Sequence, residues 1–260
     1  MSNYWQKRIA KSQTNITNKS IQETEKQLIK YYRKTMETVI DDFIETYDKL
    51  QTAIDAGKPA TPADLYKLDK YWQMQGELRQ ELEKLGYKQA ALMSDSFTRQ
   101  YQEIYRSLAI KGELTYNTID RETARQMINQ IWCADGKSWS SRVWTNTQQL
   151  ADTLNDELIN CVAAGRKTRD LKSLLQERFN VSYHRAETLV RTEMAHIQTQ
   201  AAKQRYQDYG ITEVEILADK DERRCEVCGK LHQKRYPIGA HVPIPAHANC
   251  RCCIVPVIDD

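Results

Sequence analysis

Apolar side chains recur every three to four residues along most of the chain, which is the spacing of one face of an α-helix. The first such stretch follows a capping box at residues 20–23 and is interrupted by Gly57 and Pro59. We therefore predict a helix of about 35 residues, roughly 50 Å long at the usual rise per residue. The sixteen polar residues at the amino terminus are expected to be only loosely ordered.

Two further long helices are expected before residue 117. One begins at Thr61, with Pro62 at its first helical position, and ends at Gly86; the next leads up to Gly112. Because the connections between the three helices are short, they are predicted to form a long antiparallel bundle over residues 1–116.

Shorter helices are predicted for the middle of the chain, at residues 121–132, 139–164, 168–178 and 182–209. They form a second helical domain over residues 117–210. Residues 211–217 alternate apolar and polar side chains and predict a strand, and residues 252–257 predict its partner, with Pro256 marking an edge. The third domain is then a small β module at residues 211–260, packed on helix 182–209.

The composition agrees with a mainly α protein. Of 260 residues, 40% are hydrophobic, and only 9 are glycine and 6 proline, which favours long helices over a β-rich fold. The net charge is +3, and the basic excess falls in the carboxyl-terminal third, where it permits contact with phosphate without demanding it. No apolar run is long enough to span a membrane, and residues 1–8 lack the apolar core of a signal peptide.

The strongest chemical signal is a group of metal-ligand side chains near the carboxyl end. A CxxC pair, Cys225 and Cys228, is followed by an HxxC pair, His247 and Cys250. Four such donors suit a closed, tetrahedral and structural zinc site. Cys252 is an alternative ligand, because the spacing in Cys250-Arg-Cys252 places both sulfurs on one face of an extended segment. The sequence therefore predicts a small α+β module that zinc holds together.

Other interpretations of this segment stay open. The thiols could be reduced and free of metal, with the strands stable without an ion. Gly229 is expected to allow a tight turn beneath the CxxC pair, and Cys253 is expected to point into a core. His232 and His241 are spare imidazoles in the same region, and a lone loop histidine is more often solvated than a ligand.

Two further motifs each allow a catalytic and a structural interpretation. Arg191-Thr-Glu193 precedes His196 on a predicted helix, and Glu193 and His196 share a helix face. They could form an acid–base pair, but without a nucleophile or an oxyanion site we favour a network that anchors the helix near the metal loop. The acids Asp219 and Asp221 could bind a catalytic metal, although such a mixed run is more often a turn.

Taken together, these motifs resemble the phage Mu F-like minor head proteins, also called phage head morphogenesis proteins. The resemblance covers residues 120–257 and depends on the order and spacing of several short segments. Two positions depart from the family pattern, since Ala248 stands where proline is expected and residues 216–218 lack a common tryptophan. The matching segments are Arg191–Glu193, Tyr209–Gly210, Asp219, Arg224–Leu231, Pro245–Cys252 and Pro256.

The resemblance implies a non-enzymatic minor capsid protein, present in few copies at the portal vertex of a virion and made in the host cytoplasm. Its expected roles are procapsid assembly and DNA packaging or delivery. Its expected partners are the portal protein and other head or scaffolding proteins, with non-specific DNA contact as a further expectation and no membrane association.

Two other functions remain as alternatives from the residues alone. One is a metal-dependent nuclease that uses Asp219, Asp221, His241 or Asn249, and it would need a second, open metal site. The other is a zinc-containing DNA-binding protein, which should carry a basic recognition helix beside the metal. Residues 230–247 read instead as a loop rich in proline, glycine and histidine.

Overall fold

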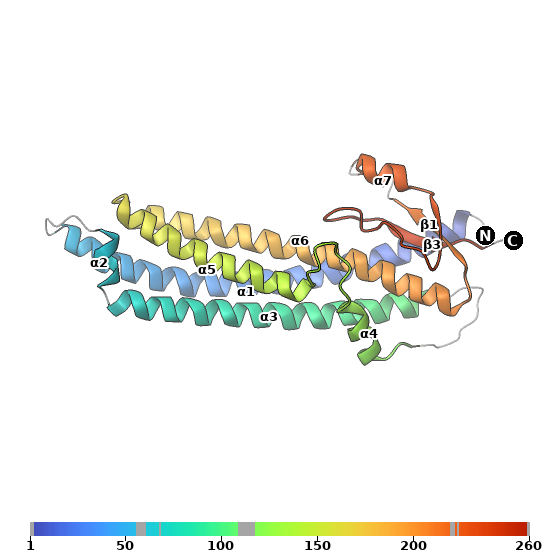
Figure 1. Ribbon diagram of the computed structural model, residues 1–260, viewed down its shortest axis with the longest axis horizontal. Coiled ribbons are helices and arrows are strands. Elements are labelled where there is room, and N and C mark those ends of the chain that lie inside the picture. Colours follow the sequence, from blue (N-terminus) through green and yellow to red (C-terminus); the bar gives the residue numbers. More distant parts are fainter. Residues whose placement is uncertain are drawn as a thin grey trace. The chain divides into compact units, whose positions relative to one another are not determined.

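The computed structural model describes residues 3–55, 61–67, 69–108, 118–218, 222 and 224–258, and it is mainly α-helical, as predicted (Figure 1). None of the described helices is both long and apolar enough to cross a membrane. The helices are α1 (Asn3–Asp55), α2 (Pro62–Tyr66), α3 (Asp69–Ser107), α4 (Arg121–Ile128), α5 (Trp139–Ala163), α6 (Thr168–Asp208) and α7 (Glu226–Leu231). The strands are β1 (Glu213–Leu217), β2 (Arg235–Pro237) and β3 (Cys253–Pro256).

Contacts divide the chain into two compact units. The first unit, called here the sheet unit, comprises residues 1–25, 92–139 and 188–260; the second, called the bundle unit, comprises residues 26–91 and 140–187. Each unit is therefore built from segments that are distant in sequence. The predicted domains 1–116, 117–210 and 211–260 are parts of the chain expected to fold independently. Compact units defined by contacts do not test independent folding, so this division stays a prediction.

The bundle unit contains the short helix α2 and four longer helical segments, from α1, α3, α5 and α6, that run side by side (Figure 1). A polar group interrupts its apolar core: Asn146 Nδ2 donates to the Tyr32 hydroxyl at 3.2 Å and to the Ser182 carbonyl at 3.0 Å. Burial and the loss of hydration raise the pKa of Tyr32 to about 12, so the hydroxyl stays protonated. The largest fully buried apolar side chains of this unit are Leu28, Phe43, Tyr47, Met74, Leu82, Leu85 and Phe179.

The sheet unit combines parts of α1, α3 and α6 with α4, α7 and a three-stranded antiparallel sheet in the order β2-β1-β3. The predicted pairing of the first and last strands is confirmed, since Ile216 lies opposite Ile254 and Leu217 opposite Cys253. Pro256 lies on an edge strand, as expected from its missing N–H. Strand β2 was not predicted, because three residues with a charged and a proline side chain give no periodic signal.

The expectation of a loosely ordered amino terminus is wrong, because α1 is helical from Asn3. Gln13 is fully buried and its Nε2 donates to the Ile254 carbonyl at 2.9 Å, which ties α1 to β3. Thr17 is also buried and bonds to Gln198 of α6. The buried face is polar here, so apolar periodicity could not reveal it.

The break predicted near residue 180 is also wrong, since α6 is continuous from Thr168 to Asp208. Asn180 and Ser182 have low helix propensity, but Ser182 is buried and its carbonyl accepts from Asn146. Tertiary packing on both sides, with Phe179 and Ala186 buried, outweighs the local preference.

The predicted helix end at Gly86 is wrong, because this residue lies inside α3. A Cβ atom at this position would lie 2.6 Å from Cζ3 of Trp144, so glycine is required by the close approach of that indole ring. Gly112, the predicted end of the next helix, lies outside the described residues.

We expect Gly86→Ala to destabilise the protein by about 1–3 kcal/mol, because Trp144 must move to admit the methyl group. Gly76 is the matched control: it lies in the same helix, and an added Cβ would meet no atom within 4 Å. Gly76→Ala should stabilise by about 0.5–1 kcal/mol through helix propensity alone. Urea unfolding of both variants measures the difference, and equal effects would show that the contact with Trp144 is unimportant.

Candidate metal centre

The CxxC pair lies at the start of α7. Cys225 is the N-cap residue, and its sulfur accepts a hydrogen bond from the Cys228 backbone N–H at 3.3 Å. This bond is the main reason that the pKa of the Cys225 thiol falls below its usual value. Gly229 lies within the helix and has no positive φ, so the expectation of a glycine-dependent turn is wrong. A short helix, which the sequence did not predict, brings the two thiols to one side.

The HxxC pair is shaped by a turn at Asn249. This residue has a φ of 60°, in the left-handed region that asparagine tolerates better than most residues. The Cys250 N–H donates to the His247 carbonyl at 3.2 Å, which closes the turn. The chain therefore reverses between His247 and Cys250, so that both side chains can face α7.

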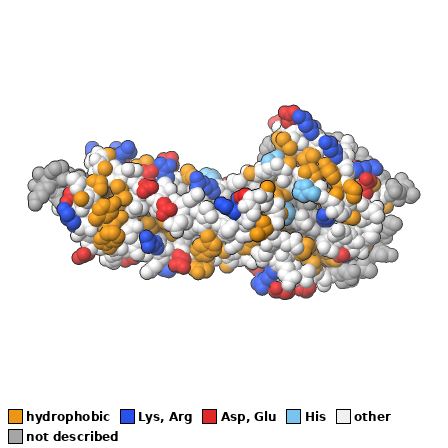
Figure 2. Space-filling view, viewed as in Figure 1, with side chains coloured by type: hydrophobic (Ala, Val, Ile, Leu, Met, Phe, Trp, Pro, Cys, Tyr) orange, Lys and Arg blue, Asp and Glu red, His pale blue; other side chains and the backbone are white. Residues whose placement is uncertain are grey.

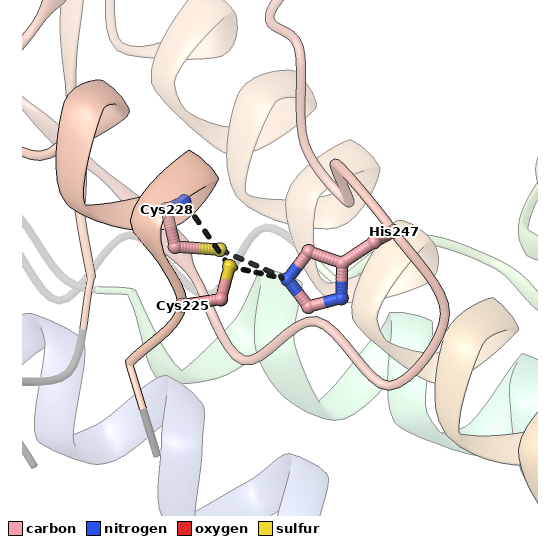
Figure 3. Close-up of side chains that lie close together, drawn as sticks. All are labelled: Cys225, Cys228 and His247. Carbon is pink, nitrogen blue, oxygen red and sulfur yellow. Dashed lines mark hydrogen bonds between the residues drawn. The ribbon is translucent and has the colours of Figure 1, made fainter. Parts of the chain in front are cut away.

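Three predicted ligands come together directly (Figure 3). Nε2 of His247 lies 3.2 Å from the sulfur of Cys225 and 3.1 Å from that of Cys228. The other ring nitrogen, Nδ1, lies 2.7 Å from the Ala248 carbonyl, to which it can donate. That hydrogen bond leaves the Nε2 lone pair directed at the two sulfurs, which is how metal-binding histidines are usually held.

Cys228 also belongs to a second cluster, with Cys250 and Cys252. Its sulfur lies 3.8 Å from that of Cys250. Two sulfurs that share a tetrahedral zinc at about 2.3 Å each would be separated by about 3.8 Å. Burial raises the pKa of the Cys228 thiol to about 12, and a hydrogen bond with Cys252 lowers that of Cys250 to about 5.

These donors fit a metal ion in number, softness and spacing. Five side chains are arranged as two triplets that share Cys228, and a tetrahedral ion needs four of them. Thiolates and imidazole are the ligands that zinc prefers in closed sites. The structure thus contains a cluster that could hold a metal. The assignment of Cys225, Cys228, His247 and Cys250, with Cys252 as the alternative, stays a prediction.

The remaining candidate residues take other places. Nδ1 of His232 accepts from the Ala218 N–H at 3.2 Å, and His241 is exposed; neither belongs to the two triplets. Cys253 is buried in β3, as expected for a packed thiol. Asp219 and Asp221 lie outside the described residues.

The Arg191-Thr-Glu193 motif anchors α6 to its surroundings. Nε and Nη2 of Arg191 contact the two carboxylate oxygens of Glu25 at 2.6 and 3.3 Å. Thr192 accepts from the Asn249 N–H at 3.1 Å, and Glu193 accepts from the Trp132 indole N–H at 3.0 Å. Thr192 therefore connects α6 directly to the turn of the metal loop, which supports the interpretation as an anchoring network.

His196 stacks on Trp132, with ring centroids 4.2 Å apart. Burial lowers the pKa of His196 to about 4, so the imidazole is neutral in the folded protein and titrates well below the unfolded chain. The free energy of unfolding is therefore unaffected by this group above about pH 6.5. It falls as the pH drops from 6.5 to 4, because the histidine of the unfolded chain takes up a proton before that of the folded protein.

We expect this histidine to cost about 2 kcal/mol of stability between pH 7 and pH 5. Urea unfolding of the wild type and of His196→Gln at both pH values measures the cost. The difference in the free energy of unfolding between the two proteins should change by this amount from pH 7 to pH 5. Taking this difference removes the contributions of other titrating groups, which both proteins share. An unchanged difference would show that His196 is not held neutral.

The surface around this centre carries mixed charges. The space-filling view shows histidine side chains beside apolar side chains in the part that carries α7, with Lys, Arg and acidic side chains close by (Figure 2). Lys230 and Glu226 of α7 form an ion pair at 2.6 Å. On this face the basic side chains are interspersed with acidic ones, unlike the uniform basic surface typical of nucleic-acid binding.

In a comparison with protein families, residues 152–255 match the model described as Phage Mu protein F like protein. No match was found among curated proteins or among solved structures. The matched range contains the Arg191-Thr-Glu193 motif and all five candidate ligands. It confirms the resemblance to the phage Mu F-like head morphogenesis family for this part of the chain.

Proposed function

We propose, on the premise that residues 152–255 are those of a phage Mu F-like protein, that this chain is a minor capsid protein of a phage head. The family match carries this proposal, because it spans both the metal cluster and the helix that anchors it. A head morphogenesis family is structural, which favours an assembly role over an enzymatic one. The same assignment implies that the protein resides in the virion.

We further propose that the metal is zinc and that its role is structural. An ion bound by Cys225, Cys228, His247 and Cys250 would connect α7 to the loop before β3. With four protein ligands no position remains open for substrate, so the ion would supply fold stability and no catalysis. Thr192 would hold the same loop against α6, so that the metal and the hydrogen bond act on one turn.

The proposed partners are the portal protein and other head or scaffolding proteins, with the chain located at the portal vertex. Exposed aromatic and aliphatic side chains are available for such contacts, including Trp72 at 59% exposure and Val227 at 53%. Assembly would take place in the host cytoplasm, and contact with DNA during packaging or delivery is part of the proposal.

Co-expression with the portal, scaffolding and major capsid proteins encoded beside it in the same genome tests this function. We expect the chain to copurify with procapsids, at far fewer copies than the major capsid protein, and to lie at one vertex when labelled for electron microscopy. Particles that assemble normally and exclude the chain would contradict the proposal. A Cys228→Ser variant that fails to enter particles would show that the metal cluster is required.

A further inference from the structure

The amino-terminal part of the chain carries basic and no acidic side chains. Residues 1–22 contain Lys7, Arg8, Lys11 and Lys19, and the first acidic residue of the sequence is Glu23. The face around α7 is different, because acidic side chains are interspersed there with the basic ones (Figure 2). The start of α1 therefore offers a surface of one charge sign, separate from the metal centre.

The buried side of α1 fixes which side chains of this segment point outward. Gln13 is buried and donates to the Ile254 carbonyl of β3. Thr17 is buried and bonds to Gln198 of α6. Residues three or four apart share one helix face, so the opposite side faces solvent. We call it the α1 basic face, and it consists of the exposed residues Tyr4, Lys7, Arg8, Lys11, Asn15, Asn18 and Gln22.

Three cations of this face keep their charge free for a partner. Lys7, Arg8 and Lys11 are exposed, and among the described residues no carboxylate forms an ion pair with them. Lys19 differs, because it lines a small hollow together with Glu23, which offsets its charge. The α1 basic face thus has a formal charge of +3.

The shape and charge of this face are complementary to a phosphate backbone. The residues from Tyr4 to Gln22 belong to one continuous helix and cover about 28 Å at the usual rise per residue. Duplex DNA presents one negative charge for about every 1.7 Å of its axis, so several phosphates lie within reach of such a face. Side-chain amides, such as those of Asn15 and Asn18, also donate to phosphate oxygens in complexes with DNA.

The other polyanionic partners fit this face less well. The guanidinium group of Arg8 lies 5.2 Å from the ring centroid of Trp5, and the ring of Tyr4 meets the same indole edge-on at 5.5 Å. An indole already covered in this way is less available to stack on an unpaired base of a single strand. Between Lys7 and Gln22 the face holds only polar side chains, whereas a helix that lies in a membrane surface turns an apolar face to the lipid.

We propose that the α1 basic face binds the phosphate backbone of duplex DNA without sequence preference. Lys7, Arg8 and Lys11 each contact a phosphate, and the amides of Asn15 and Asn18 extend the contact along the helix. This inference rests on the proposed function for the presence of DNA, and it names the surface that makes the contact.

The test uses the full chain with its metal content unchanged and a fluorescently labelled duplex of about 20 base pairs. Anisotropy gives the affinity at several salt concentrations between about 20 and 150 mM. The triple variant Lys7→Gln, Arg8→Gln and Lys11→Gln should bind at least about tenfold more weakly at about 50 mM salt. The slope of log affinity against log salt should become shallower by about 2.7, because each lost phosphate contact removes about 0.9.

A second triple variant is the matched control. Arg79→Gln, Lys84→Gln and Lys88→Gln remove the same three charges from exposed positions of α3. Acidic residues are interspersed there, and Lys84 is paired with Glu81 at 2.6 Å. This variant should keep the affinity and the slope of the wild type. All six positions are exposed, so both triple variants should keep their circular dichroism.

Three results would overturn the proposal: no binding of the duplex by the wild type at about 20 mM salt, equal losses in the two triple variants, or an unchanged slope in the first. Tighter binding of a single strand of the same length, of polyglutamate or of vesicles containing phosphatidylserine would overturn it as well. Entry into procapsids tests the head function and is a separate readout. A wild type that enters procapsids without binding the duplex would contradict this inference alone.

Discussion

Cys228→Ser is expected to lower zinc affinity by at least about a hundredfold and to unfold the segment from β1 to β3. Cys228 is the one residue that belongs to both triplets of candidate ligands among the described residues, so its loss leaves only two donors in each triplet. The metal connects α7 to the loop before β3, and the short strands have little core of their own to replace it. Competition with a chromophoric chelator measures the affinity, and amide hydrogen exchange locates the unfolding.

Cys133→Ser is the matched control, because it removes a half-buried thiol that lies outside both triplets. Its affinity for zinc should equal that of the wild type. Chelation of the wild type should have the same result as Cys228→Ser, with loss of protection after residue 211 and retained helicity in the bundle unit. If Cys228→Ser keeps full affinity, Cys228 is not a zinc ligand and the predicted set of four ligands is wrong.

Phe43→Ala should destabilise the bundle unit by about 3–5 kcal/mol, because Phe43 is fully buried and its loss leaves a cavity. Leucine at the same position keeps most of the volume and should cost less than about 1.5 kcal/mol. Urea unfolding followed by circular dichroism measures both values. This is the largest single effect that we expect on stability from a side chain away from the metal cluster.

The zinc content of Phe43→Ala, measured under conditions where it is still folded, should remain that of the wild type, since no candidate ligand belongs to the bundle unit. Together with Cys228→Ser, this variant separates packing from metal binding. A loss of zinc in folded Phe43→Ala would show that the metal centre depends on the core of the bundle unit.

The helical fold class could be predicted from the sequence because most buried faces are apolar and periodic. The errors fall where that rule does not hold. The buried face of α1 at Gln13 and Thr17 is polar, Gly86 serves a close contact with Trp144, and the continuity of α6 through Ser182 depends on tertiary packing. Each of these depends on contacts between segments distant in sequence, which a pattern of single positions does not contain.

The candidate site was more accessible, because ligand spacing is a local property. CxxC and HxxC identified the donors, but the short helix α7, the left-handed turn at Asn249 and the sharing of Cys228 between two triplets required the fold. The role of Thr192 in holding the metal loop also could not be read from a three-residue motif.

The most direct measurement is zinc K-edge X-ray absorption on the purified full chain, combined with elemental analysis. We expect one zinc per chain, with three sulfur neighbours at about 2.3 Å and one nitrogen at about 2.0–2.1 Å. A chain that binds no zinc under reducing conditions, or a zinc surrounded only by oxygen and nitrogen, would contradict a structural centre built by Cys225, Cys228, His247 and Cys250.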